Sequence, residues 1–127
     1  MLEEKIKQAT THIVRVVFPN LTNNYDTLFG GTALQWMDEI AFITATRFSR
    51  QKFVTVSIDR TDFNKPIPAG TIAELIGTVV KVGNTSLQVK VDIYLEEMYH
   101  ESRELAIEGL ITMVAVDENR KPTPVKV

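Results

Sequence analysis

Residues 27–39 read TLFGGTALQWMDE, and they open the longest apolar-rich segment of the 127-residue chain. After the glycine pair, Trp36, Ile40 and Thr44 recur at the spacing of one helix face, and further apolar residues fill other faces up to about residue 50. A helix that is apolar almost all round is typically buried. The segment therefore predicts one long central helix, which the rest of the chain has to cover.

Most of the remaining sequence is typical of β structure. Apolar and polar residues alternate most clearly from Leu87 to Leu95, Gly83-Asn84 is typical of a two-residue hairpin turn, and Gly77 is interpreted as a bulge position. Strands are predicted over residues 12–18, 53–63, 71–82, 87–95 and about 103–116. The order predicts an α+β fold in which a curled antiparallel sheet wraps around the helix.

One such sheet cannot cover the central helix on all sides. Pairing with a second copy is the simplest closure, and it would also protect an exposed edge strand. We therefore expect self-association.

Composition excludes several classes of function. Hydrophobic residues make up 44% of the chain, the formal net charge is −2 and the sequence pI is about 5.7, so no global basic field would attract nucleic acid. Cysteine is absent, which removes disulfides and thiolate nucleophiles, and no metal-binding or phosphate-loop motif occurs. The charged first residues lack the apolar core of a signal peptide, and charges interrupt residues 30–48. We expect a cytoplasmic protein with neither a metal nor a membrane or nucleic-acid partner.

Several short motifs in a fixed order resemble the hotdog-fold acyl-CoA thioesterases, in particular the branch of bacterial short- and medium-chain and brain-type acyl-CoA hydrolases. They are residues 27–39, Val54-Thr55-Val56-Ser57-Ile58-Asp59, Phe63 with Pro66-Ile67 and Gly70, Gly83-Asn84-Thr85-Ser86, and Lys121-Pro122-Thr123-Pro124-Val125. The similarity covers about residues 10–125 of what we expect to be a single domain over 1–127. It implies a hotdog fold, a homodimer with a continuous sheet, and possible trimers of dimers.

The resemblance also implies a set of site residues. The acidic helix residue is Asp38, the helix-entry glycines are Gly30 and Gly31, and the loop asparagine, which faces the partner's acid, is Asn23. The implied coenzyme A contacts are Val54, Thr55, Gly83, Asn84, Thr85 and Ser86. Relatives often have glycine where Asp26 stands.

The chemistry of these residues fits thioester hydrolysis. A partly desolvated Asp38 would gain basicity and could act as a general base or as a nucleophile. Free N–H groups at Gly30 and Gly31 could form an oxyanion hole at the positive end of the helix, and Asn23 could position water or the carbonyl. Taken alone, each has a structural interpretation, namely a surface acid, a plain turn and an Asx-turn.

The sequence predicts hydrolysis of fatty acyl-CoA to a free fatty acid and CoA without a separate cofactor. The alternative is a non-catalytic acyl-CoA binding or sensing module, since fold alone does not establish activity. A third hypothesis is hydrolysis of carrier-protein-bound acyl groups or aryl-CoA. Arg47 and Lys65 are possible phosphate contacts, whereas His12 and His100 lie outside any catalytic motif and are expected to be structural.

Overall fold

The computed structural model describes all residues from 1 to 127. Two helices, one short 3₁₀ turn and five strands follow one another along the chain. They are α1 (Leu2–Ala9), β1 (Thr11–Val16), η1 (Pro19–Leu21), α2 (Gly30–Ser49), β2 (Lys52–Phe63), β3 (Ile72–Val82), β4 (Ser86–Glu96) and β5 (Glu104–Val116).

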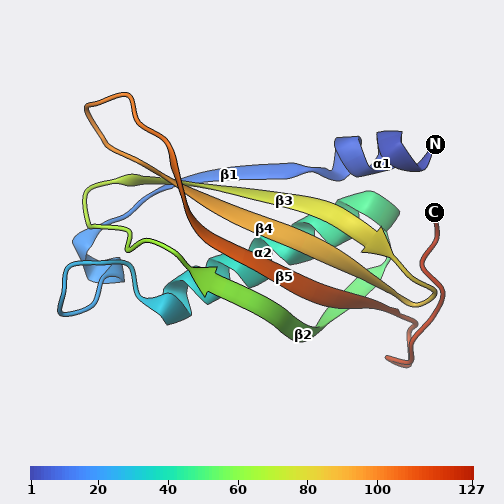
Figure 1. The fold of residues 1–127 in the computed structure, drawn as a ribbon. Coiled ribbons are helices and arrows are strands. Elements are labelled where there is room, and N and C mark those ends of the chain that lie inside the picture. Colours follow the sequence, from blue (N-terminus) through green and yellow to red (C-terminus); the bar gives the residue numbers. More distant parts are fainter.

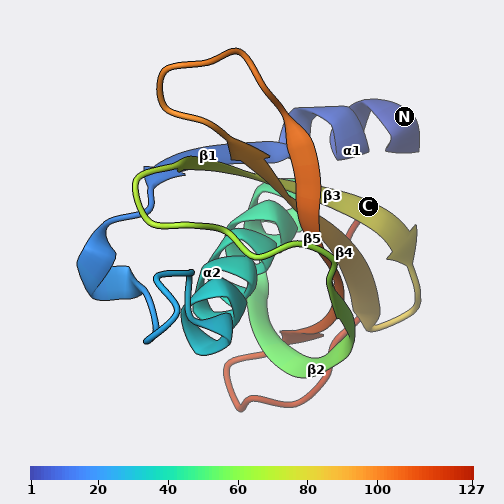
Figure 2. The same ribbon diagram turned by 60° about the vertical axis from the view of Figure 1, so that its left-hand side comes forward.

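The five strands form one antiparallel sheet in the order β1-β3-β4-β5-β2, so β1 and β2 are its edges. The sheet curls around α2, which runs along its concave side (Figure 1, Figure 2). This arrangement confirms the predicted α+β class and the predicted central helix. All five predicted strands are present, with ends that differ from the predicted ones by two residues at most.

The core lies between the concave face of the sheet and one side of α2. Alternate residues of β3, β4 and β5 are buried against the helix, and the period-2 pattern predicted for β4 is therefore confirmed. From α2 the core receives Ala33, Trp36, Met37, Ile40, Ala41, Ala45 and Phe48.

Two strand glycines allow α2 to lie close to the sheet. A Cβ on Gly77 of β3 would stand 2.5 Å from the Thr44 hydroxyl, and a Cβ on Gly109 of β5 would stand 2.0 Å from Cε of Met37. The interpretation of Gly77 as a bulge is wrong, because it pairs regularly with Thr11 and Val91. Its physical role is close approach, and the irregularity in β3 falls later, between Val79 and Lys81.

Helix α1 was not predicted. Its first turn carries Glu3 and Glu4 and its last turn carries Lys7, which suits the helix dipole. It packs beside the end of α2, where Arg47 donates hydrogen bonds to the carbonyl of Gln8 (3.0 Å) and the hydroxyl of Thr11 (2.9 Å). Eight residues with few apolar side chains give too weak a periodic signal for the helix to be predicted. Packing against α2 supplies the stability that intrinsic helix propensity does not.

The β3–β4 connection also differs from the prediction. Three residues, 83–85, join the strands, and Gly83 does not adopt a left-handed conformation. The carbonyls of Asn84 and Thr85 accept hydrogen bonds from Val125 (2.8 Å) and Ala115 (2.9 Å). Contacts to β5 and the C-terminal segment thus shape this hairpin, instead of the two-residue turn chemistry that we expected.

One side of the molecule is apolar and uncovered. Edge strand β2 exposes most of its length, and α2 presents a stripe with Gln35, Glu39 and Phe42 exposed. This confirms the expectation that one such sheet leaves part of the helix uncovered. Large apolar side chains are exposed on β2 and near the helix at Phe29, Phe42, Val54, Val56, Ile58 and Phe63. No helix combines the length and apolarity needed to cross a membrane.

The glycine contacts lead to a prediction about stability. Replacing Gly77 by alanine should destabilise the fold by about 1–3 kcal/mol, because the Thr44 side chain is fully buried, stiff and hydrogen-bonded to the Ile40 carbonyl at 2.7 Å. Urea unfolding measures this cost. Gly77→Ala should cost less unfolding free energy when Thr44 is also replaced by alanine. If the free-energy changes of the two single variants simply add in the double variant, the contact is contradicted.

Candidate functional site

The first turn of α2 leaves three backbone N–H groups free. Neither Gly30, Gly31 nor Thr32 donates a backbone hydrogen bond, and the first N–H that does is that of Ala33, to Phe29 at 3.0 Å. No side chain caps this end. A Cβ on Gly31 would meet no atom within 4 Å. The fold of one chain therefore does not require glycine there, and the positive helix end is open to an outside acceptor.

Asp38 lies two turns further along α2, on the same face as Gly31. It is half-buried, because the helix face that carries it is the one the sheet leaves uncovered. The Thr55 hydroxyl donates a hydrogen bond to Asp38 Oδ1 at 2.5 Å, so β2 fixes the orientation of this carboxylate. Within the chain, Oδ2 accepts no hydrogen bond and stays available for a proton or an electrophile.

Asn23 lies in the loop between η1 and α2, where its amide oxygen is fully engaged. It accepts hydrogen bonds from the N–H groups of Tyr25 (2.9 Å) and Thr27 (3.2 Å) and from the Thr27 hydroxyl (3.2 Å). The Asx-turn interpretation is therefore confirmed. Because the oxygen faces the loop, the amide nitrogen faces away, and it donates no hydrogen bond within the chain.

Within one chain, no hydrogen bond joins Asn23 to Asp38. Nearby, Asp26 adopts φ = 60°, a left-handed conformation that aspartate tolerates and glycine adopts freely. Asp26 is exposed, and its backbone geometry would suit the glycine that the family resemblance implies for this position.

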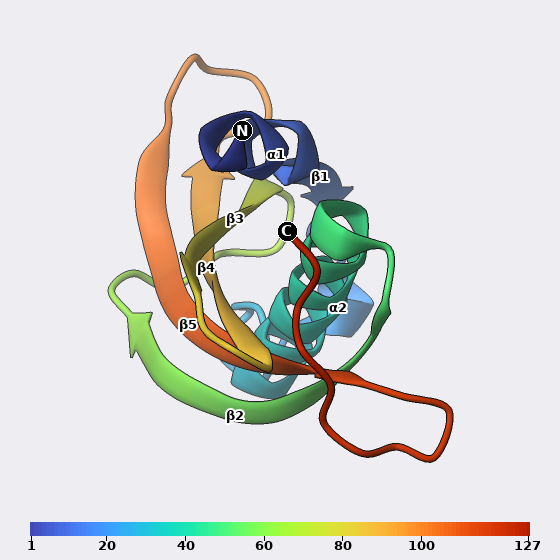
Figure 3. The same ribbon diagram turned by 90° about the vertical axis from the view of Figure 1, so that its right-hand side faces the viewer.

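The predicted coenzyme contacts fall in two places. Thr55 and the half-exposed Val54 lie on β2, with Thr55 against Asp38. The hairpin from Gly83 to Ser86 lies at the other end of the molecule from the start of α2, beside the C-terminal segment (Figure 1, Figure 3). One chain therefore does not bring all the predicted site residues together.

Other candidate side chains serve the fold. Arg47 holds α1, as described above, and Lys65 pairs with Glu104 at 3.3 Å, so neither is free for a phosphate. Nδ1 of His12 lies 3.2 Å from a carboxylate oxygen of Glu74 on the exposed face of the sheet. No group of three or more histidine or acidic side chains is arranged as a metal site.

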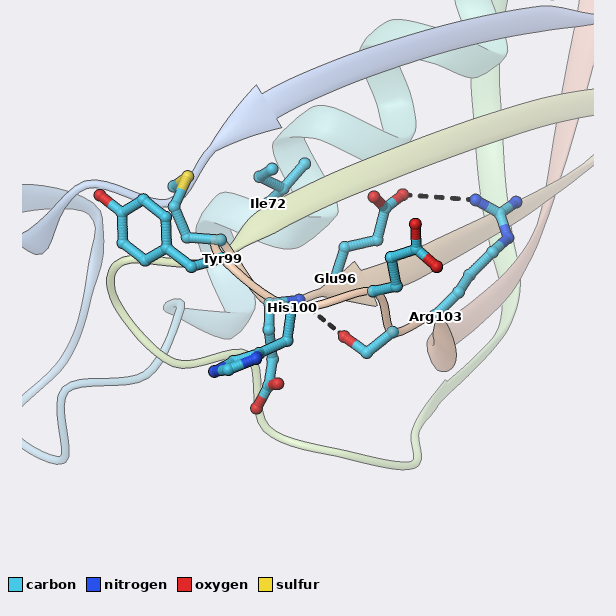
Figure 4. Close-up of a pocket in the computed structure, with 9 residues that line it drawn as sticks. Ile72, Glu96, Tyr99, His100 and Arg103 are labelled. Carbon is cyan, nitrogen blue, oxygen red and sulfur yellow. Dashed lines mark hydrogen bonds and ion pairs between the residues drawn. The ribbon is translucent and has the colours of Figure 1, made fainter.

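A wide recess in the surface lies apart from the residues discussed so far. It has a volume of about 770 Å³ and is formed by Ile72 and residues 96–103, in the loop between β4 and β5 (Figure 4). At its edge, Arg103 stacks on the ring of Tyr94 at 4.0 Å and bridges Glu74 and Glu96. The hydrogen bond from Arg103 holds the pKa of Glu74 below its usual value, and this network anchors the loop to the sheet.

Comparison with known proteins identifies the family. The family profile described as "Thioesterase superfamily" matches residues 25–101, more than half of the chain and including the start of α2. The chain belongs to the thioesterase superfamily. The predicted resemblance to hotdog-fold thioesterases is thereby confirmed.

Among thioesterase-superfamily members, the chain is 44% identical over 109 residues to the uncharacterized acyl-CoA thioester hydrolase YkhA of Bacillus subtilis. The match covers 86% of this chain and 63% of that protein, so the chain spans less than two thirds of this relative's length.

Two solved structures of superfamily members are close in fold. An acyl-CoA hydrolase from Staphylococcus aureus, in complex with butyryl coenzyme A, coenzyme A and coenzyme A disulfide, has a TM-score of 0.90 and 37% identity, covering 94% of this chain and 73% of that one. An apo-hexameric acyl-CoA thioesterase has a TM-score of 0.91 and 40% identity, covering 94% and 77%.

Variants of the Staphylococcus aureus enzyme have also been solved, in which one asparagine, one aspartate or one threonine is replaced by alanine. The separations of these three residues along that chain equal those of Asn23, Asp38 and Thr55 here. Sequence reasoning had assigned Thr55 to coenzyme binding alone. Its hydrogen bond to Asp38 was missed because the local pattern shows only a strand residue, whereas the contact depends on how β2 packs against α2.

The loop network at the recess makes stability depend on pH. Because the pKa of Glu74 is lowered in the folded state from 4.5, its ionised form contributes stability above that value, and the contribution is lost as the pH falls through the folded-state pKa. Urea unfolding should find wild type more stable than Glu74→Gln at pH 7, with the difference shrinking at about pH 3. An equal difference at both values would contradict the assignment.

Proposed function

We propose that the protein is an acyl-CoA thioesterase that hydrolyses fatty acyl-CoA to a free fatty acid and CoA. The observation that carries the proposal is the carboxylate of Asp38, which Thr55 holds in place with one oxygen free, on the helix face that also carries the open N–H group of Gly31. The similarity to acyl-CoA hydrolases supports the same activity.

In this mechanism the open N–H groups at Gly30 and Gly31 bind the thioester carbonyl oxygen. As water attacks the carbonyl carbon, Asp38 takes its proton as general base, and the negative charge that develops on oxygen is stabilised by these donors. Collapse of the tetrahedral intermediate breaks the C–S bond, and the sulfur leaves with a proton as free CoA. A direct attack by Asp38 through an anhydride uses the same groups.

Helix geometry favours a site shared between two chains. The backbones of Gly31 and Asp38 are separated by about 10 Å along one helix, since each residue rises about 1.5 Å. Donor and base must both reach one carbonyl group at hydrogen-bond distance, directly or through one water. We propose that Gly31 and Asn23 of one subunit face Asp38 of the other, with the free amide nitrogen of Asn23 as a second donor to the carbonyl oxygen.

The exposed edge supports the same arrangement. Strand β2 has unpaired backbone groups on its outer side and carries Val54, Val56 and Ile58 with more than 40% of each residue's surface exposed. Pairing two β2 strands would extend the sheet and cover this surface. We propose a homodimer on this edge, and the hexameric thioesterase of similar fold supports a possible trimer of dimers.

The alternative function is a non-catalytic module that binds or senses acyl-CoA, and hydrolysis of carrier-protein or aryl-CoA thioesters is a third. A free-thiol release assay over acyl-CoAs of several chain lengths separates the hydrolase from the sensor. Release of CoA supports the hydrolase. Saturable binding of acyl-CoA without release would overturn it in favour of the sensor.

Asp38→Asn should retain the fold and lower turnover by about 10² or more, because asparagine can still accept the hydrogen bond from Thr55 but cannot take a proton. The kcat for CoA release, together with the melting temperature, checks this. Glu39→Gln, the neighbouring exposed acid, is the matched control and should keep near-normal turnover. Near-normal turnover of the Asp38→Asn variant would show that Asp38 is not the catalytic base.

The Gly31→Ala variant distinguishes an effect on stability from an effect on turnover. Since its Cβ would meet nothing within the chain, the unfolding free energy should stay the same or rise by up to about 1 kcal/mol. Turnover should fall by roughly 10-fold or more, because the methyl group would crowd the approach of the carbonyl to the helix end. A stable variant with unchanged kcat would contradict an oxyanion role for this turn.

A further inference from the structure

Strand β2 is irregular in two places close to the candidate site. Its pairing with β5 shifts first after Thr55 and again after Ile58, so that Val56 and Asp59 are extra residues without a partner on β5. Extra residues of this kind bend a strand and change the direction of its side chains. The strand is strongly curved in Figure 2 and Figure 3. Its path beside α2 therefore depends on these two positions.

The first irregularity puts Thr55 and Ser57 on opposite faces of the sheet. Thr55 pairs with the buried Met113 and donates its hydroxyl hydrogen to Asp38 on the helix side. Ser57 pairs with Thr112, which precedes Met113 in β5 and therefore lies on the outer face. In a regular strand, residues two apart share one face. The extra residue thus allows Thr55 to face Asp38 while Ser57 faces outward.

One carboxylate holds this segment on the outer face. Oδ1 of Asp59 accepts a hydrogen bond from the Ser57 hydroxyl at 2.5 Å, and Oδ2 accepts hydrogen bonds from the Thr112 hydroxyl and from the amide nitrogen of Gln88 at 3.2 Å. The donors belong to β2, β5 and β4, which are neighbours in the sheet. The hydrogen bonds from Ser57 and Thr112 hold the pKa of Asp59 below its usual value. The carboxylate is therefore ionised at neutral pH, and each of these hydrogen bonds is charge-assisted.

Thr55 is closely confined on the helix side. Its Oγ1 lies 3.3 Å from Sδ of Met113 and 2.5 Å from Oδ1 of Asp38. Because a thioether sulfur is a weak acceptor, the hydroxyl hydrogen goes to the carboxylate. Met113 is fully buried and belongs to the core. The direction of the Thr55 hydroxyl therefore follows the path of the β2 backbone.

We propose that Asp59 is a positioning residue for the reaction, which keeps the Thr55 hydroxyl directed at Asp38 by holding β2 in its irregular path. The inference rests on the proposed hydrolase function and deepens it, since it names a residue that acts on the base from the opposite face of the sheet. Asp59 acts through the backbone of residues 55–59. Without its hydrogen bonds this segment can return toward regular pairing, and a shift of one residue turns side chains to the other face.

A double-variant cycle on kcat tests this role. Asp59→Ala should lower the kcat for acyl-CoA by roughly three- to tenfold, the scale of one oriented hydrogen bond, with KM changed by less than about twofold. Thr55→Val, which removes the hydroxyl and keeps the size of the side chain, should cause a similar loss. Adding Asp59→Ala to Thr55→Val should lower kcat no further, because no hydroxyl is then left to direct.

Asp62→Ala is the matched control. Asp62 is a carboxylate on the same strand, beyond the second irregularity, and pairs with Arg60 at 2.9 Å. Its removal should leave kcat within about twofold of wild type, since exposed ion pairs contribute little. Equal losses in the Asp59 and Asp62 variants would overturn the inference while the hydrolase function stands. The same holds if the losses of Asp59→Ala and Thr55→Val multiply in the double variant.

Ser57→Ala replaces Asp59→Ala if the latter does not fold. It removes one donor and keeps the carboxylate, so it should give a smaller loss of kcat that again disappears in the Thr55→Val background, whereas losses that multiply would overturn the inference. If wild type releases no CoA, the proposed function fails, and a crystal structure of the Asp59→Ala or Ser57→Ala variant then decides. A lost hydrogen bond between Thr55 and Asp38 supports the positioning role, and an intact one overturns it.

Discussion

The close contact between α2 and the sheet at Gly77 and Gly109 is the constraint on which the rest of the structure depends. Side chains of Ile40, Thr44 and Met37 occupy the space that a Cβ at either glycine would take. With the helix this close, the sheet curls around one side of it and buries the apolar face. The position of Asp38 relative to Thr55 of β2 follows from that packing, so a contact in the core sets the geometry of the candidate site.

The same packing leaves the opposite side of α2 without cover. One five-stranded sheet is wide enough for one helix face, and the exposed stripe then carries Asp38 and Gly31 next to an apolar, unpaired β2. Asp38 as the base and Gly31 as the oxyanion donor lie too far apart along one helix for both to reach the same carbonyl group. A second chain paired along the β2 edge would therefore cover the exposed helix face and also complete the site.

Much of this architecture was predictable from periodicity. The alternation from Leu87 to Leu95 and the apolar-rich segment after Gly31 locate β4 and α2 well, because strict alternation marks a strand with one buried face and a long apolar segment marks a core helix. Helix α1 and the role of Gly77 were missed, since both depend on contacts between segments far apart in the sequence. For the site, the motif pointed to Asp38, whereas its bond to Thr55 and the engaged oxygen of Asn23 needed coordinates.

Mixing subunits gives the sharpest test of a site built from two chains. Asn23→Ala and Asp38→Asn chains, each nearly inactive alone, would be combined and the heterodimer purified with two different tags. A symmetric dimer of this kind has one intact site and one doubly altered site, so CoA release should recover to about half of the wild-type rate. A verified heterodimer that is no more active than its parents would contradict a site shared between subunits.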